Sequence, residues 1–184
     1  MFNPNTERLL DYWRGRRTGR PAPRRADIDP ADFARLTAQV FIAAREGGDY
    51  RFRLAGEAVA ALCGRPLGGE SALRLWRIED RGRLVRLLAA SLAGAEPLVV
   101  LGEAAQPPGG AARLAILFAP LADAAGEPDR FLGLVQPLAF GLSAPIPPLS
   151  IAAVNGLEET ARRAHLRLAA LDGRQIASAA GQRR

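Results

Sequence analysis

Few side chains in this sequence have the types and spacing that metal binding or catalysis requires. Its 184 residues include one cysteine, Cys63, and one histidine, His165. Protein zinc sites usually take three or four such ligands, so we expect no structural metal. An enzymatic nucleophile needs a base within hydrogen-bonding reach. His165 lies in a predicted C-terminal helix that would have to fold back over the domain to act on Cys63, and nothing in the sequence requires this.

Two further motifs resemble catalytic signatures but have structural explanations. Asp27 and Asp29 form an Asp-x-Asp pair like those of phosphoryl-transfer enzymes, yet no buried strand precedes them. Asp29, directly before a proline, is typical of a helix N-cap. The glycines at 64, 68 and 69 are not followed by the Gly-Lys-Ser/Thr of a phosphate-binding loop, because the chain contains no lysine. The sequence therefore predicts that the protein is not an enzyme.

The net charge of +6 is concentrated near the N-terminus. Against the single acid Asp11, the segment from residue 8 to residue 25 holds seven arginines: Arg8, Arg14, Arg16, Arg17, Arg20, Arg24 and Arg25. Such a stripe could bind nucleic acid, but the signatures of helix-turn-helix proteins, zinc fingers and RNA-binding aromatic strands are missing. We therefore prefer a solvated helix and linker, and rank nucleic-acid binding below it.

Hydrophobic residues make up 48% of the chain and charged residues 24%, which suits a protein with a buried core. No apolar run approaches the ~18 residues that span a membrane. The first residues lack the basic and apolar regions of a signal peptide. We expect a cytoplasmic protein without membrane contact.

The first 38 residues are predicted to hold two helices joined by an arginine-rich linker. Residues 5–17 place Leu9, Leu10 and Trp13 on one helical face, and the prolines of "TGRPAPRR" end that helix. A short second helix begins after Asp29. The apolar face of the first helix needs a cover, either a sheet in the same chain or a dimer mate. Leu9, Leu10 and Trp13 are therefore the first candidates for a dimer interface.

From residue 39 the spacing of apolar residues changes from helical to alternating. "QVFIAARE" and "DYRFRLAG" are two such runs, and the glycines between them predict a hairpin. In the second strand, Tyr50, Phe52 and Leu54 are expected on one face. Arg51 and Arg53 are expected on the other, which is either the solvent face or a face covered by the N-terminal helix.

Three helices and three strands are expected between the hairpin and residue 140. The helices are "EAVAALC", a short one that ends near Trp76, and a longer one capped by Asp80. In the longer helix, Leu84, Leu88 and Leu92 form a buried stripe. Strand-like runs begin at residues 98, 112 and 130. Strands separated by a helical block favour an α+β fold with an antiparallel sheet.

This order of elements, together with three stretches of sequence, resembles the PAS domain family, and within it a bacterial subfamily of small stand-alone proteins. The stretches are "LLDYWRGRRTGRPAPRRADIDPADFARL", "YRFRLAGEAVAALCGRPLGG" and "EDRGRLVRLL". The resemblance implies a five-stranded antiparallel sheet in the order 2-1-5-4-3, with a pocket between the sheet and short helices. Residues 39–140 are then the PAS-like domain. Residues 1–38 precede it as N-terminal helices and linker, and residues 141–184 follow as a proline-rich linker, a C-terminal helix and a frayed tail.

The resemblance also implies a pocket and its possible cofactors. Predicted facing selects eight pocket residues: Leu54, Leu62, Cys63, Trp76, Leu88, Ile116, Phe118 and Val135. Some PAS domains bind haem through a histidine on the long helix, but this helix contains none. Others bind flavin through a cysteine in a motif like Gly-x-Asn-Cys-Arg-Phe-Leu, and Cys63 lacks those neighbours. We expect neither cofactor. We interpret Cys63 as a small buried hydrophobe and Trp76 as a core residue rather than a pocket wall.

The family points to a non-enzymatic sensory or regulatory protein of signalling. As a homodimer, it would bind an unknown small ligand or contact an unknown signalling protein. The alternative is a structural adaptor whose own side chains fill the pocket, and the two differ in whether the candidate residues enclose a void. Apolar residues at 157, 161, 164, 168 and 171 predict a C-terminal helix that covers its own domain, a dimer mate or a partner.

Overall fold

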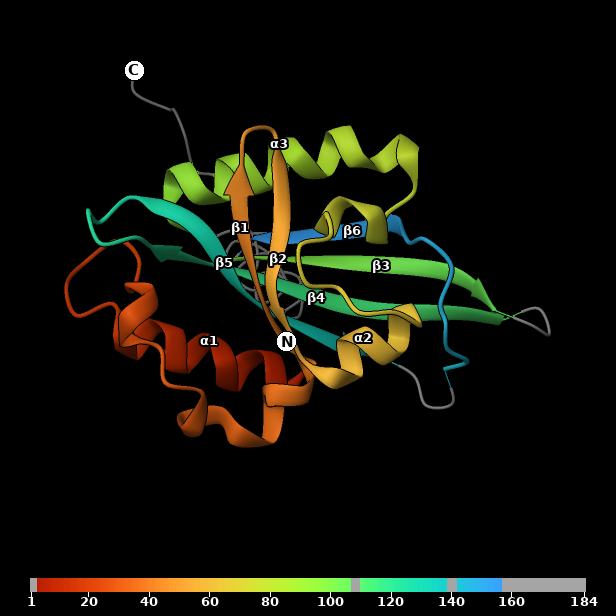
Figure 1. Ribbon diagram of the computed structural model, residues 1–184, viewed down its shortest axis with the longest axis horizontal. Coiled ribbons are helices and arrows are strands. Elements are labelled where there is room, and N and C mark those ends of the chain that lie inside the picture. Colours follow the sequence, from red (N-terminus) through yellow and green to blue (C-terminus); the bar gives the residue numbers. More distant parts are fainter. Residues whose placement is uncertain (1–2, 107–109, 139–141, 157–184) are drawn as a thin grey trace, which may run out of the picture.

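The centre of the molecule is one antiparallel sheet (Figure 1). The computed structural model describes residues 3–106, 110–138 and 142–156. In these residues the strands follow the order β2-β1-β5-β4-β3-β6, so the predicted order 2-1-5-4-3 is confirmed and β6 extends the sheet at β3. The strands are β1 (Val40–Glu46), β2 (Asp49–Ala55), β3 (Leu98–Gln106), β4 (Gly110–Ala122), β5 (Pro128–Pro137) and β6 (Ser150–Gly156).

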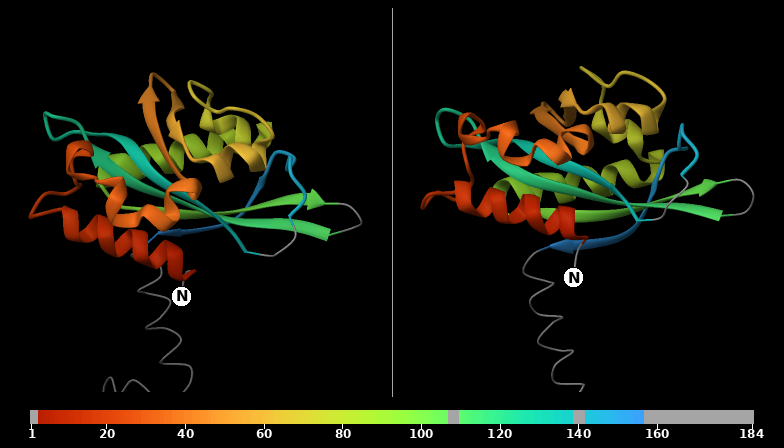
Figure 2. Two further views of the ribbon diagram at one scale, coloured as in Figure 1. Left: turned by 60° about the horizontal axis from the view of Figure 1, so that its bottom comes forward. Right: turned by 90° about the horizontal axis from the view of Figure 1, so that it is seen from below.

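Helices cover both faces of the sheet (Figure 2). One core lies under α2, the 3-10 helix η3 and α3, and a second core lies under α1 and the 3-10 helix η2. None of the described helices is long and apolar enough to cross a membrane. The helices are α1 (Pro4–Arg16), η1 (Arg25–Asp27), η2 (Pro30–Gln39), α2 (Glu57–Cys63), η3 (Ala72–Leu75) and α3 (Ile78–Gly94).

The predicted helix caps are right at η2 and wrong at α3. Asp29 caps η2, because its side chain accepts a hydrogen bond of 2.9 Å from the amide of Ala31. α3 begins at Ile78, before the predicted cap Asp80. The Asp80 carboxylate instead accepts a hydrogen bond of 3.0 Å from the backbone N–H of Ile151 in β6. Asp80 therefore joins α3 to a strand that lies far away in the sequence.

β6 occupies part of the segment predicted as a linker and C-terminal helix. Ser150–Gly156 pairs with β3 along its length, so the linker assignment is wrong for these residues. As an edge strand it is only half-buried, and its sequence "SIAAVNG" lacks the regular alternation that reveals a strand. The predicted C-terminal helix falls beyond residue 156, outside the described residues.

A β-bulge in the hairpin turns Leu54 to the opposite face from Phe52. Phe52 pairs with Ala43 and Leu54 pairs with Ile42, which leaves Arg53 without a residue opposite. Because side chains alternate with a period of two, one extra residue reverses the facing of those beyond it. Leu54 is 47% exposed and lies beside Ile42, so its predicted position in the pocket is wrong.

The apolar face of α1 is buried within its own chain. Leu9, Leu10 and Trp13 are each at most 1% exposed. The Trp13 indole donates a hydrogen bond of 2.6 Å from Nε1 to the carbonyl oxygen of Pro120 in β4. The prediction of a dimer interface at these three residues is therefore wrong, because the sheet of the same chain already covers them.

Candidate functional site

A cavity of about 200 Å³ lies on the sheet face that α2 and η3 cover. β4 and β5 form its floor, and α2, η3 and residues 146–149 form its walls. Its lining is apolar except for one thiol and two guanidinium groups. The lining residues are Val59, Leu62, Cys63, Arg65, Arg74, Leu75, Leu114, Ile116, Val135, Ile146, Pro147, Pro148 and Leu149.

Residues 146–149, here called the strap, are bound to the neighbouring helices by backbone hydrogen bonds of 2.8 Å each. The amide of Ile146 donates to the carbonyl of Leu62 at the end of α2, and the amide of Leu149 donates to the carbonyl of Leu75 in η3. The amide of Arg77 in turn donates a hydrogen bond to the carbonyl of Leu149. The strap was not predicted as a cavity wall. Its prolines predicted a linker, and no local pattern shows what that linker lies against.

The structure brings half of the predicted pocket residues to the cavity. Four of the eight line it: Leu62, Cys63, Ile116 and Val135. Three belong to the same core without lining the cavity: Trp76, Leu88 and Phe118. Leu54 lies on the other face of the sheet, as described above. Part of the predicted set thus lines a void, and another part packs in the core.

Aromatic rings fill the core on the same face of the sheet. Phe41 contacts Phe52 and Phe118 edge-on, with ring centroids 5.4 and 5.6 Å apart, and Phe131 contacts Phe118 at 5.6 Å. Gly133 in β5 makes room for them, since a β-carbon there would lie 2.0 Å from Cζ of Phe41. Dense packing in this part of the core restricts the void to the part lined by α2, η3 and the strap.

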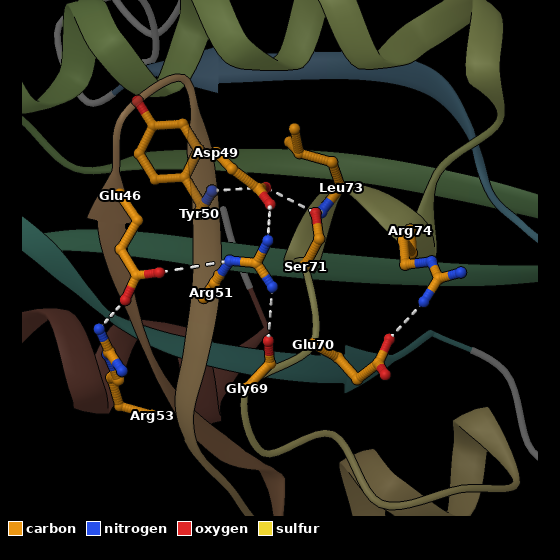
Figure 3. A network of polar contacts seen from close by, with 10 residues as sticks. All are labelled: Glu46, Asp49, Tyr50, Arg51, Arg53, Gly69, Glu70, Ser71, Leu73 and Arg74. Carbon is orange, nitrogen blue, oxygen red and sulfur yellow. Dashed lines mark hydrogen bonds and ion pairs between the residues drawn. The ribbon is translucent and has the colours of Figure 1, made fainter.

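Arg65 and Arg74 line the cavity, and Glu70 beside them pairs with both; these three residues are here called the rim. Arg74 Nη1 lies 2.7 Å from Glu70 Oε2 (Figure 3), and Arg65 Nη1 lies 3.0 Å from the same oxygen. Hydrogen bonds from Arg74 and then Arg65 hold the pKa of the Glu70 carboxyl below its ordinary value. With two positive groups and one negative group, the rim has a net positive charge.

Arg51 of the hairpin holds the loop that carries this rim (Figure 3). Its Nη1 donates a hydrogen bond of 2.9 Å to the carbonyl of Gly69. Asp49 accepts a further hydrogen bond of 2.6 Å from the hydroxyl of Ser71. Arg51 is itself exposed and pairs with Glu46 and Asp49 at 3.3 and 3.4 Å. Of the two predicted environments for the hairpin arginines, Arg51 thus occupies the solvent face, where it fastens the rim to β2.

The sequence pattern that defines the PAS domain family matches residues 1–136. The chain belongs to the PAS domain family. The predicted family is therefore confirmed, and with it the fold of a sensory domain of signalling proteins. No curated protein matches the sequence.

Solved structures with distant similarity include sensory proteins. A light-oxygen-voltage domain described with a flavin analogue is 15% identical, with a TM-score of 0.47 over 77% of this chain and 93% of that chain. The LOV protein of Rhodobacter sphaeroides is 14% identical, with a TM-score of 0.45 over 62% of this chain and 70% of that chain. A sensory box histidine kinase/response regulator of Burkholderia thailandensis is 14% identical, with a TM-score of 0.39 over 78% of this chain and 97% of that chain. Similarity this distant does not identify a ligand for the PAS domain described here.

The described lining of this PAS cavity offers no histidine to ligate haem, and the cavity is small for a flavin. Its volume of about 200 Å³ is below the roughly 300–1,000 Å³ of pockets for drug-sized ligands. The lining contains no histidine, and its polar side chains are the Cys63 thiol and the two rim arginines. An engineered apolar cavity of about 150 Å³ takes benzene. The PAS cavity therefore suits a molecule close to benzene in size.

Cys63, the last residue of α2, lines the cavity with its thiol. Burial raises its pKa, and the charge of Arg65 offsets the rise only in part. The thiolate is the reactive form of cysteine, so a raised pKa makes Cys63 a poor nucleophile near neutral pH.

Two arginines of the arginine-rich segment pair with carboxylates that follow it in the sequence. Arg16 binds Asp32, and Arg20 lies 2.6 Å from Asp27. Arg17 packs over the ring of Trp13, with its guanidinium carbon 5.3 Å from the ring centroid. These contacts orient several of the arginines toward their own domain instead of leaving them as one exposed stripe.

We therefore expect no saturable binding of duplex DNA or single-stranded RNA, even at about 50 mM salt, where phosphate contacts are strongest. Fluorescence anisotropy with labelled oligonucleotides across a salt series measures this directly. A complex whose affinity falls linearly with the logarithm of salt concentration would contradict the expectation.

Proposed function

We propose that the protein is a non-enzymatic PAS sensory protein that takes a small molecule into the cavity beneath the strap. The observation that supports this function is the cavity itself, a void of about 200 Å³ beside a core of buried aromatic rings in contact with one another. A concave, mostly apolar site with a few polar groups at its edge is typical of small-molecule binding sites. The void favours sensing over the adaptor alternative, in which the side chains close the pocket.

The cavity lining favours binding over catalysis. A nucleophile needs a neighbouring base, and the described lining residues include a thiol of raised pKa but no histidine or carboxylate. We therefore propose no reaction at this site.

The strap gives the ligand a route to the rest of the protein. A molecule in the cavity would touch Ile146 and Leu149, and the chain continues from the strap directly into β6. β6 is in turn joined to α3 by the bond between Ile151 and Asp80. We propose that occupancy shifts the strap and β6, and that a homodimer mate or a signalling partner reads this change.

Filling the cavity should abolish ligand binding. In Cys63→Phe, the added ring would occupy the void, whereas Cys63→Ala leaves it open. We expect benzene, titrated into the full-length protein and followed by NMR, to shift resonances of the cavity residues in the wild type and in Cys63→Ala but not in Cys63→Phe.

Native mass spectrometry of the purified protein complements this titration, because it reports subunit number and retained small molecules together. An adduct present in the wild type and absent from Cys63→Phe would support the proposal. Benzene shifts of equal size in all three proteins would show that the ligand binds elsewhere and contradict it.

A further inference from the structure

The cavity is charged at one end and apolar elsewhere. Its floor and walls are apolar, and its two charged lining residues, Arg65 and Arg74, both carry positive charge. Both are exposed at the surface end of the site, while the floor residues Ile116 and Val135 are buried. A ligand that fills this cavity therefore has an apolar body in the core and one end at two guanidinium groups.

The two guanidinium groups retain capacity to bind an anion. Each has five N–H donors, and within the described part of the chain Glu70 is the ion-pair partner of both. Both contacts reach one atom, Glu70 Oε2, through one Nη1 atom of each arginine. The remaining donors and the net positive charge make the rim complementary to a second carboxylate.

We propose that the ligand is a small monocarboxylate with an apolar body, its carboxylate bound by Arg65 and Arg74 and its body in the cavity. This inference rests on the proposed function and adds the chemical class of the ligand. Guanidinium groups bind carboxylates through paired, charge-assisted hydrogen bonds. A neutral molecule of the same size would gain only the apolar contacts, and a cation would be repelled by the rim.

The loop contacts support a binding role for the rim. Arg51 and Asp49 fix the loop on both sides of Glu70, at Gly69 and Ser71. Glu70 itself is held through its carbonyl, which accepts a hydrogen bond of 2.9 Å from the amide of Phe52. A rim fixed in this way loses little conformational freedom when an anion binds.

Three six-carbon compounds that differ in the head group test the proposal: hexanoate, 1-hexanol and hexylammonium. NMR titration of the full-length protein gives their dissociation constants. We expect hexanoate to bind at least about tenfold more tightly than 1-hexanol, the effect of one charge-assisted hydrogen bond. Hexylammonium should bind most weakly.

Substitutions at the rim distinguish the contribution of the ligand's head group to binding from the contribution of its apolar body. Arg65→Gln and Arg74→Gln should each weaken hexanoate binding about tenfold and leave 1-hexanol binding unchanged. Glu70→Gln should strengthen hexanoate binding, because it removes the competing carboxylate. Arg83→Gln, an exposed position on α3 outside the cavity, is the matched control and should change nothing.

The outcomes distinguish this inference from the function on which it rests. If hexanoate and 1-hexanol bind equally and the rim variants have no effect, the carboxylate assignment fails while the cavity remains a ligand site. If none of the compounds binds and benzene also fails to bind, the proposed function fails as well.

Discussion

Replacing Trp13 with alanine should destabilise the protein by about 4 kcal/mol, the scale of removing a buried aromatic side chain. Trp13 is fully buried between α1 and the sheet. The substitution also removes the indole N–H that donates to the Pro120 carbonyl at 2.6 Å, which leaves that buried acceptor without this partner. Equilibrium unfolding in urea, with the full-length protein, measures the loss.

Two other substitutions in the same helix serve as controls for this result. Trp13→Phe keeps an apolar ring and loses the hydrogen bond, so its loss of stability should be smaller. Arg14→Ala changes an exposed residue and should alter stability by less than about 0.5 kcal/mol. Size-exclusion chromatography with light scattering should find the same subunit number in all of them. A Trp13→Ala protein of normal stability but altered subunit number would restore α1 as a dimer interface.

Gly133→Ala should destabilise the protein by about 3 kcal/mol, at the upper end of the usual range for an overpacked core. The new β-carbon would lie 2.0 Å from the Phe41 ring, far inside van der Waals contact. Phe41 is 1% exposed and held edge-on by the rings of Phe52 and Phe118, so it cannot swing aside. Thermal and urea unfolding of the variant test this expectation.

The same substitution at another glycine is the control. Gly82 lies on the exposed side of α3, and a β-carbon there would meet its nearest neighbour, Nη1 of Arg86, at 3.8 Å. Gly82→Ala should therefore stabilise the protein by ~0.5–1 kcal/mol through helix propensity. Adding Phe41→Leu to Gly133→Ala should recover part of the loss, since the two residues share one space. Independent, additive effects of these two changes would rule out the clash as the cause.

Periodicity in the sequence was enough to predict the fold class and most of its elements. The leucines at 84, 88 and 92 define the buried stripe of α3, and all three are buried there. Alternation and the two glycines of the hairpin predicted β1 and β2, which form as expected. These features are local, because each depends on the spacing of residues within one element. The family motifs then supplied the order of the strands.

The candidate site could be predicted only in part. Leu62, Cys63, Ile116 and Val135 line the cavity because each lies on a regular element whose facing follows from its period. Leu54 was misplaced because a single bulge at Arg53 reverses the facing in β2, and bulges have no clear local signature here. The apolar face of α1 was predicted to lie in a dimer interface. The spacing of its apolar residues shows that this face must be covered, but it does not show which surface covers it.

The sequence by itself determined the family, the α+β fold, most of the described helices and five of the strands of this protein. Only the tertiary structure decided that α1 is buried in its own chain, that the strap walls the cavity and that Arg65 and Arg74 meet at its rim. The physical reason is distance along the chain. Secondary structure follows from interactions between near neighbours, whereas a cavity forms where distant segments fail to fill the space between them.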